Sequence, residues 1–201
     1  MIKFVSLLFS LLLFSPVVNS TTLLIVGDSL SAGYNIRAEK SWPVLLPAEL
    51  TKQQQQLTVI NASISGDTSG NGLQRIPGLL TQHKPDYVLV ELGANDGLRG
   101  FSPKIISDNL SKMIDLIEAQ DAQTILMQIR VPTNYGKRYG DAFASIYPTL
   151  SEQKKIPLMP FYLKQVIVKP EWMQQDGLHP NEKAQAWIAE FIATELGKII
   201  N

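Results

Sequence analysis

Residues 22–33 read TLLIVGDSLSAG, and this stretch decides the fold class. Its first part, Thr22 to Val26, is a short apolar run rich in β-favouring side chains and predicts a fully buried strand. The run ends at Gly27 and passes directly into a polar turn that continues to Gly33. A buried strand that opens into a glycine-bearing loop is typical of α/β proteins with a parallel sheet.

The rest of the chain repeats this alternation of strand-like and helix-like segments. Four more strands are predicted, at 57–60, 87–92, 124–129 and 156–159. Helices are predicted to begin at Ser41 and to cover 68–83, 102–117 and 182–199. The 68–83 helix is predicted in spite of Gly70, Gly72 and Pro77, and Asn181 is the expected cap of the last helix. The sequence therefore predicts an α/β fold with a five-stranded, mainly parallel sheet that is covered on both faces.

Polar loops follow the first three predicted strands, at 27–33, 61–67 and 93–97. In an open parallel sheet, sites form beyond the carboxyl ends of the strands, so these loops are expected at one edge. The segment 176–181, DGLHPN, stands just before the last helix. One return of the chain brings it to the same edge.

The residues in these loops fit nucleophilic catalysis. A serine hydroxyl such as that of Ser29 needs a base to remove its proton, and an imidazole such as His179 is the usual base at neutral pH. Asp176, three residues before His179, is close enough to hold the second ring nitrogen. The Ser29 and Gly66 backbone N–H groups and the Asn95 amide are candidate donors to a negatively charged oxygen.

These loops resemble the GDSL, or SGNH, hydrolase superfamily, which is named for its Ser, Gly, Asn and His. The resemblance extends over essentially the whole chain after residue 20. It rests on four blocks in order: GDSLSAGY at 27–34, NASISGDTS at 61–69, ELGANDGLRG at 91–100 and DGLHPN at 176–181. GDSL alone is a weak signal, whereas four blocks with the right spacing are a strong one.

The resemblance implies a three-layer α/β/α sandwich of the flavodoxin-like kind. It also implies a nucleophile at Ser29, a base and acid at His179, and an orienting carboxylate at Asp176. Ser29 N–H, Gly66 and Asn95 would form the oxyanion hole. The implied substrates are small-molecule acyl esters and thioesters: acyl-CoA thioesters, lysophospholipids and aryl esters.

Each residue also has a purely structural interpretation. Ser29 alone could be a helix cap, Asp176 and His179 could belong to a surface turn, and Gly66 and Asn95 could serve turns that need positive φ. His83, at a predicted helix end, is interpreted as a solvated side chain or a dipole partner rather than a catalytic group.

Three further acids, Asp28, Asp67 and Asp96, are interpreted as hydrogen-bonding braces of the loops. No dense set of oxygen ligands accompanies them, so no metal site is predicted. The proposed chemistry needs no cofactor.

Composition narrows the class of protein. Among 201 residues, 18 basic and 18 acidic side chains cancel, and no Lys/Arg block stands out, which argues against nucleic-acid binding. The chain has no cysteine, which excludes disulfides, thiolate metal sites and a cysteine nucleophile.

Residues 1–20 predict a secretory signal peptide. Lys3 precedes an apolar run that ends at Phe14, and small residues stand one and three positions before a cut after Ser20. We therefore expect a single catalytic domain over 21–201, located in the periplasm or secreted, without stable membrane insertion and monomeric. No later segment is apolar enough over about 20 residues to span a membrane.

Three functions are compatible with the sequence. The first is a serine esterase and thioesterase. Ile76, Leu79, Leu80 and Leu98 are candidates for the lining of its acyl groove and are equally compatible with an ordinary core position. The second is a carbohydrate O-deacetylase of the same superfamily. The third is a non-catalytic, flavodoxin-like binding module, against which the absence of a phosphate-loop motif argues.

Overall fold

The computed structural model describes residues 21–200, and the predicted signal peptide at 1–20 lies outside that range. A single five-stranded sheet has the order β2-β1-β3-β4-β5, and every pairing in it is parallel. Its strands are β1 (Thr21–Gly27), β2 (Leu57–Asn61), β3 (Tyr87–Glu91), β4 (Gln123–Met127) and β5 (Leu158–Met159). The predicted parallel sheet of five strands is confirmed.

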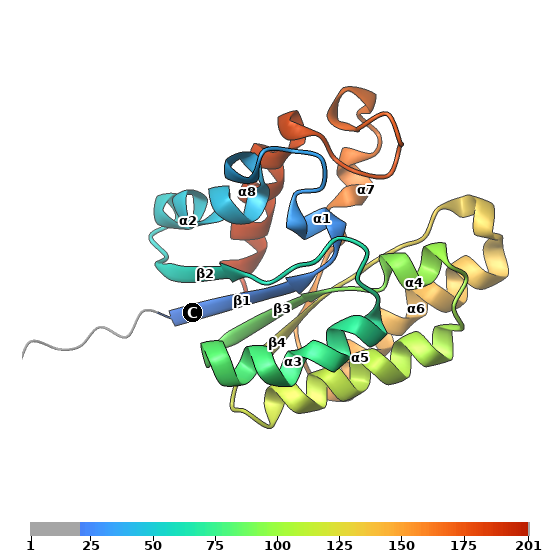
Figure 1. The fold of residues 1–201 in the computed structure, drawn as a ribbon, viewed down its shortest axis with the longest axis horizontal. Coiled ribbons are helices and arrows are strands. Elements are labelled where there is room, and N and C mark those ends of the chain that lie inside the picture. The colour runs from blue at the N-terminus through green and yellow to red at the C-terminus, as the bar shows by residue number, and fades with distance from the viewer. Residues whose placement is uncertain (1–20, 201) are drawn as a thin grey trace, which may run out of the picture.

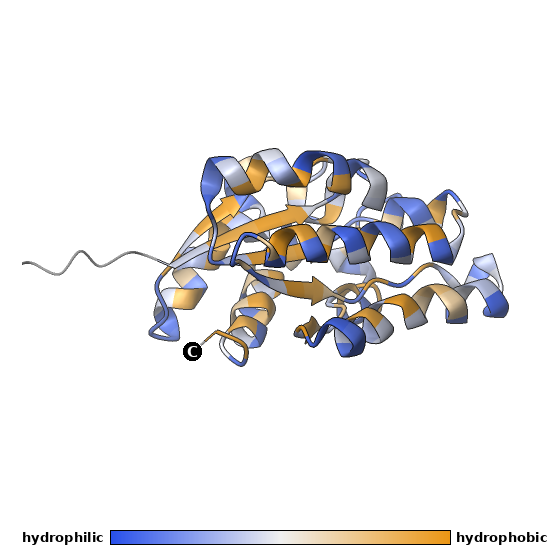
Figure 2. Ribbon diagram, turned by 90° about the horizontal axis from the view of Figure 1, so that it is seen from below, coloured by the Kyte–Doolittle hydropathy of each residue, from blue (hydrophilic) through white to orange (hydrophobic). Residues whose placement is uncertain are grey.

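The central strands are apolar because helices cover them on both sides. Leu23, Leu24, Ile25 and Val26 of β1 are fully buried, as are three consecutive residues of β3. Each such side chain stabilises the fold by about 1.5–3 kcal/mol relative to an exposed one. Figure 2 shows the strands as mainly hydrophobic and the surrounding helices as striped, with a polar side turned outward. This is the pattern of a parallel sheet inside a sandwich.

Helices form the two outer layers (Figure 1). One face of the sheet is covered by α2 (Trp42–Lys52) and α8 (Glu182–Leu196), which pack against each other. The other face is covered by α3 (Ser69–His83), α5 (Pro103–Glu118) and α6 (Lys137–Lys154). The architecture is therefore the expected three-layer α/β/α sandwich.

Short helical turns lie in the connecting segments. They are α1 (Ser29–Ala32), α4 (Ala94–Leu98), α7 (Leu163–Val166), and the 3₁₀ turns η1 (Ala38–Lys40), η2 (Thr133–Tyr135) and η3 (Pro170–Trp172). The strand order reverses at β1, whose neighbours β2 and β3 are reached in opposite directions. Such a switch point opens a crevice at the carboxyl edge of the sheet, and this is where the polar loops lie.

The helix predicted at 68–83 forms, and its start is well capped. The Thr68 side chain accepts from the Asn71 N–H, and the Asn71 side chain accepts from the Thr68 N–H, so the two form a capping box. These bonds offset the cost of the glycines and Pro77 within the helix. The predicted start at Ser41 is correct in position, but the Ser41 hydroxyl donates to the Ala38 carbonyl instead of capping α2.

The main differences from the predicted elements concern the carboxyl-terminal half, where β4 also ends at Met127 rather than at 129 and α8 at Leu196 rather than at 199. Helix α6 was not predicted, although it has a buried stripe at helical spacing, made of Phe143, Ile146, Tyr147 and Leu150. Strand β5 is only two residues long and starts later than predicted, because Pro157 cannot donate a ladder hydrogen bond.

Candidate active site

The turn after β1 exposes Ser29 at the edge of the sheet. Asp28 is the N-cap residue of α1 and accepts from Leu30 N–H at 3.0 Å, which makes Ser29 the first residue of a helical turn. Gly27 is required at the end of the strand, since a Cβ there would lie 2.6 Å from Oε2 of the buried Glu91. The serine hydroxyl is therefore presented from a turn that buried contacts hold on both sides.

The structure brings the predicted base to this hydroxyl. His179 Nε2 lies 2.8 Å from Ser29 Oγ, although the two residues are 150 positions apart. His179 Nδ1 lies 2.7 Å from Asp176 Oδ2. Serine, imidazole and carboxylate thus form a continuous line of hydrogen-bond contacts, which is the geometry of a serine hydrolase triad.

The backbone around Asp176 orients its carboxylate. Asp176 Oδ1 accepts from the backbone N–H groups of Leu178 and His179, at 2.9 and 3.0 Å, which leaves Oδ2 for the ring. Desolvation opposes ionisation, but the hydrogen bonds from the His179 ring, the His179 N–H and the Leu178 N–H outweigh it, so the pKa of Asp176 is lowered. Asp176 is therefore ionised at neutral pH and suited to hold an imidazolium.

A tight loop presents His179 to the serine. Gln174 N–H donates to the His179 carbonyl at 2.8 Å, and Gly177 has a φ of 67°, which favours glycine. Asn181 is confirmed as the cap of α8, since its side chain accepts from Lys183 N–H. The Asn181 amide also donates to the carbonyls of Glu171 and Met173, so the cap ties α8 to the start of the histidine loop.

An aromatic ring packs beside the histidine. The Tyr34 and His179 ring centroids are 4.6 Å apart at an interplanar angle of 39°. Gln174 donates from its side chain to the Tyr34 carbonyl at 2.8 Å, which joins the turn after α1 to the histidine loop. Tyr34 therefore limits the directions in which the imidazole can turn.

The predicted oxyanion donors come from the loops after three neighbouring strands. Gly66 has a φ of 87°, as expected for a glycine turn, whereas Asn95 lies in α4 and is not at positive φ. The Asn95 amide nitrogen lies 2.9 Å from the Asp67 carbonyl oxygen and so contacts the loop that carries Gly66. Arg99 donates to the Gly66 carbonyl at 3.2 Å. Ser29, Gly66 and Asn95 thus share one edge of the sheet.

The three other loop acids brace the site, as the sequence predicted. Asp67 forms an ion pair with Arg75 at 2.7 Å, and this pair is largely buried. Asp96 is fully buried and accepts from both the N–H and the hydroxyl of Ser69, at 2.7 and 2.5 Å. These bonds fix the loops after β2 and β3 relative to each other.

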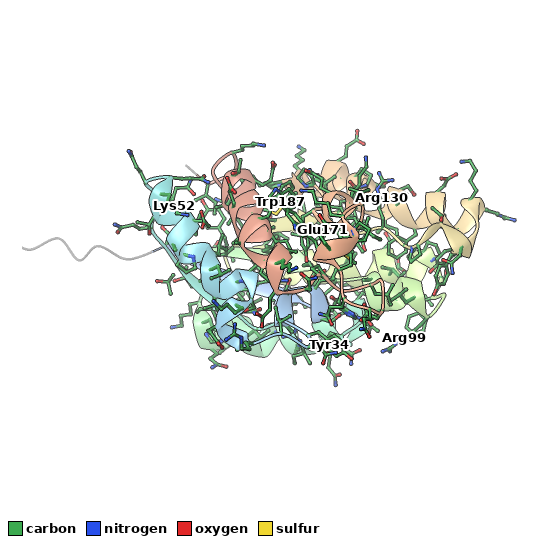
Figure 3. The ribbon with its side chains drawn as sticks, turned by 90° about the horizontal axis from the view of Figure 1, so that it is seen from above. Tyr34, Lys52, Arg99, Arg130, Glu171 and Trp187 are labelled. Carbon is green, nitrogen blue, oxygen red and sulfur yellow. The ribbon has the colours of Figure 1, made fainter. Side chains whose placement is uncertain are left out.

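A cavity of about 450 Å³ begins at Ser29 and His179 and runs across the carboxyl ends of β3, β4 and β5. Most of its lining is apolar, and the apolar side chains include Leu98, Val131, Phe161, Leu163, Ile167 and Leu178. Figure 3 shows Tyr34 near the lower edge of the view and Arg130 in the upper part. Arg130 lines the cavity and follows β4. The cavity is shaped for an apolar group attached to a carbonyl carbon at Ser29.

The structure assigns most of the four candidate groove residues to the core, the second of their two interpretations. Of the four, only Leu98 lines the cavity, whereas Ile76 and Leu80 are buried in the core and Leu79 packs against the core. These three residues lie on α3, whose apolar side faces the sheet. The lining residues that the sequence analysis missed follow β4 and β5, where no motif marked them.

His83 is separate from this edge. It is the last residue of α3, and a helix of that length places its end about 20 Å from its start. The chain then turns back into β3, so His83 lies by the amino ends of the strands, as expected for a residue outside the site.

Within residues 21–200, no three or more His, Asp or Glu side chains gather in a way that could hold a metal ion. Over the same range, none of the helices has both the length and the apolar character needed to cross a membrane.

Comparison with known proteins agrees with this geometry. Residues 25–187 match the model of the GDSL-like Lipase/Acylhydrolase family. An arylesterase of Vibrio mimicus is 61% identical over 198 residues, covering 98% of this chain and 99% of that protein. Thioesterase 1/protease 1/lysophospholipase L1 of Escherichia coli strain K12 is 50% identical over 194 residues, covering 96% and 92%.

A solved structure is similar in both sequence and fold. The psychrotrophic esterase EstA from Pseudoalteromonas sp., in a structure inhibited by monoethylphosphonate, has a TM-score of 0.88 and 43% identity. The match covers 90% of this chain and 100% of that one. The chain therefore belongs to the GDSL-like lipase/acylhydrolase family.

Proposed function

We propose that this protein is a serine hydrolase that cleaves carboxylic ester and thioester bonds through an acyl-enzyme on Ser29. The observation that carries the proposal is the 2.8 Å contact between His179 Nε2 and Ser29 Oγ, with Asp176 Oδ2 at 2.7 Å from the other ring nitrogen. A serine hydroxyl needs such a base to act as a nucleophile near neutral pH.

In the first half of the reaction, the Ser29 oxygen attacks the carbonyl carbon while its proton passes to His179 Nε2. The ring then donates that proton to the leaving alcohol or thiol, and the acyl group stays on Ser29. In the second half, His179 takes a proton from water, the hydroxide attacks the acyl carbon, and the proton returns to Ser29 as the acid leaves.

Negative charge develops on the carbonyl oxygen in both halves. The proposed donors to it are the Ser29 N–H, the Gly66 N–H and the Asn95 amide, and each is worth roughly a hundred- to a thousandfold in rate. Asp176 accepts from Nδ1–H and stabilises the imidazolium that forms in each half. None of these steps involves a cofactor.

The proposed substrates are small acyl esters and thioesters with an apolar acyl chain: aryl esters, lysophospholipids and acyl-CoA thioesters. Two observations support them. The cavity beside Ser29 is predominantly apolar, and the relatives carry the names arylesterase and thioesterase 1/lysophospholipase L1. A carbohydrate acetyl ester would leave most of that cavity unfilled.

We further propose that residues 1–20 are removed on export and that 21–201 act as a single monomeric catalytic domain in the periplasm or outside the cell. The basic start and the apolar run before residue 20 support the export step. Mass spectrometry of the exported protein tests the cut, which should leave Thr21 as the first residue.

A panel of substrates tests the function. Purified wild type and Ser29→Ala are assayed on p-nitrophenyl esters from acetyl to decanoyl, on an acyl-CoA thioester, on a lysophospholipid and on an acetylated sugar. We expect wild type to cleave the first three classes, with activity rising beyond acetyl, and the variant to be inactive. Activity that peaks at acetyl and is absent beyond butyryl would favour the deacetylase, and no turnover at all would favour a binding module.

A further inference from the structure

One buried acid at the site has no part in the reaction described above. Asp28 stands directly before Ser29 and is fully buried. No lysine or arginine of residues 21–200 forms an ion pair with it. Burying a carboxylate without a cation beside it costs free energy. The hydrogen bonds that Asp28 accepts must offset that cost.

Those hydrogen bonds lead to the Asn95 amide. Asp28 Oδ1 accepts from Leu30 N–H at 3.0 Å, and Asp28 Oδ2 accepts from Asn95 Nδ2 at 3.1 Å. The same Nδ2 donates to the Asp67 carbonyl at 2.9 Å. An amide nitrogen carries two hydrogens, so these two bonds fix both its position and the plane of the amide.

The three bonded residues lie in the loops after three adjacent strands. Asp28 follows β1, Asp67 follows β2, and Asn95 follows β3. These are the loops that carry Ser29, Gly66 and Asn95 itself. A single nitrogen atom therefore ties together every element from which the oxyanion donors come.

We propose that ionised Asp28 is a positioning residue that holds one N–H of the Asn95 amide, so that the other N–H, which donates to the Asp67 carbonyl in the free site, is directed at the oxyanion when substrate binds. The inference rests on the proposed function, since it takes Asn95 as a donor in ester hydrolysis. The ionised form is needed because two N–H groups point at two different oxygens of Asp28. Protonation makes one of these oxygens a donor and weakens it as an acceptor, and replacement by an amide puts a nitrogen that cannot accept in one of the two places.

The surroundings of Asp28 make this ionisation sensitive to pH. Burial, with smaller contributions from the charges of Asp96 and Asp67, raises the pKa of Asp28 to about 7 against the hydrogen bonds from Leu30 and Asn95. A further buried acid, Glu91, accepts a hydrogen bond from the Asp28 N–H. Burial raises the pKa of two neighbouring tyrosines, Tyr147 and Tyr162, and the Asp28 charge adds to that rise.

Glu91, on β3, is the neighbouring buried acid and serves as a comparison. Its Oε2 accepts from the Ser31 hydroxyl at 2.7 Å and from Asp28 N–H at 3.4 Å, and among residues 21–200 its Oε1 has no partner. Burial and the Asp28 charge raise the pKa of Glu91 well above its usual range, so Glu91 is the neutral member of the pair. It makes no hydrogen bond to Asn95.

A double-mutant cycle tests the proposal. Asp28→Asn, Asn95→Ala and the double variant are compared with wild type on a p-nitrophenyl ester at about pH 8, where Asp28 is ionised. We expect Asp28→Asn to lower kcat at least about tenfold with little change in KM, and Asn95→Ala to lower it about 10²–10³-fold. The double variant should be no slower than Asn95→Ala, because Asp28 acts through Asn95.

Glu91→Gln is the matched control, since it replaces a neutral buried acid by an amide of the same shape. It should keep kcat within about threefold of wild type. Multiplicative losses in the double variant, full kcat in Asp28→Asn, or an equal loss in Glu91→Gln would each overturn the proposal. Circular dichroism and thermal melting establish that the variants compared are folded.

A second measurement needs no change at Asp28. If both His179 and Asp28 must lose a proton, log kcat/KM of wild type should fall on the acid side with a limiting slope of about two. In Asn95→Ala the slope should be about one, because Asp28 no longer has an amide to hold. Equal slopes would overturn the proposal. Failure of the proposed function is distinguishable, since wild type would then hydrolyse no ester or Ser29→Ala would remain active.

Discussion

The two halves of the active site are built differently. The half that follows β1, β2 and β3 is a network of buried polar groups, in which Asp28 and Asp96 are fully covered and hydrogen-bonded to neighbouring loops. The half that follows β4 and β5 is an apolar cavity whose outer residues, among them Arg130, Ile167 and Leu178, are exposed. The first half holds the catalytic groups in fixed positions, and the second half provides an apolar surface for the substrate.

This difference follows from the physics of the two kinds of contact. Hydrogen bonds are directional and are strong where water is excluded, so a buried network can fix donors to a fraction of an ångström. Apolar contacts scale with area and tolerate changes of shape. We infer that the nucleophile half determines the reaction and the groove half determines which acyl chains are used.

The largest effect should come from the triad. Ser29→Ala and His179→Ala are each expected to lower kcat by about 10⁴–10⁶-fold, and the double variant should lose no more than either alone, because the two act as a unit. Steady-state kinetics on one aryl ester measure all three. Losses that multiply in the double variant would mean that serine and histidine act in separate steps.

Asp176→Asn should have the next largest effect. The asparagine Oδ1 can keep both backbone hydrogen bonds, but the amide nitrogen that replaces Oδ2 cannot hold the imidazolium. We therefore expect turnover to fall about a thousandfold or more with little change in binding. KM and kcat measured separately check this split. An unimpaired variant would show that another group orients the ring.

Stability should reveal the cost of the buried acids in the first half. Burial raises the pKa of Asp28 from 3.8 to about 7, so folding favours its protonated form. The stability that this proton contributes is complete below about pH 4 and is lost as pH rises through about 7, an effect of order a few kcal/mol. Asp28→Asn should therefore flatten the fall in the free energy of unfolding between pH 4 and 8.

Urea unfolding at a series of pH values measures this dependence. Glu91→Gln should flatten it as well, because the pKa of Glu91 is also raised by burial. The exposed Asp108, which pairs with Lys104 on α5, provides the control, and Asp108→Asn should leave the slope unchanged. A wild-type slope equal to that of Asp28→Asn would contradict the assignment of a costly charge to Asp28.

The smallest effect is expected in the groove half and should be selective. Phe161→Ala removes apolar surface from the cavity lining and should lower kcat/KM for an octanoyl ester about tenfold relative to an acetyl ester. Ile76→Val is the control, since Ile76 is in the core and not in the cavity. It should lower stability by about 0.5–1.5 kcal/mol and leave the chain-length ratio unaltered. Equal ratios in both variants would remove the distinction between the two halves.

The sequence predicted the first half of the site well and the second poorly. Ser29, Gly66 and Asn95 stand in short motifs in the loops after three apolar strands, so both their residue types and their place at the sheet edge could be predicted. Val131, Phe161 and Leu163 are ordinary apolar residues in irregular segments, and nothing local separates a cavity wall from a core position. For the same reason the sequence left Ile76 open between groove and core.

The fold followed a similar rule. Every boundary of strands β1 to β4 lies within two residues of the prediction, because a buried parallel strand is a short apolar run. Helix α6 was missed because Pro148 and several polar residues obscure its buried stripe. The approach of His179 to Ser29 depends on the packing of α8 against α2, a contact between the two ends of the domain that no local pattern encodes.

Covalent labelling tests whether Ser29 is a nucleophile that His179 activates. Wild type is treated with a fluorophosphonate, digested and analysed by mass spectrometry to locate the adduct, with Ser29→Ala and His179→Ala treated in parallel. We expect one adduct on Ser29, none in Ser29→Ala, and much slower labelling in His179→Ala. Folded wild type that stays unlabelled, or carries the adduct on another serine, would contradict this role of Ser29.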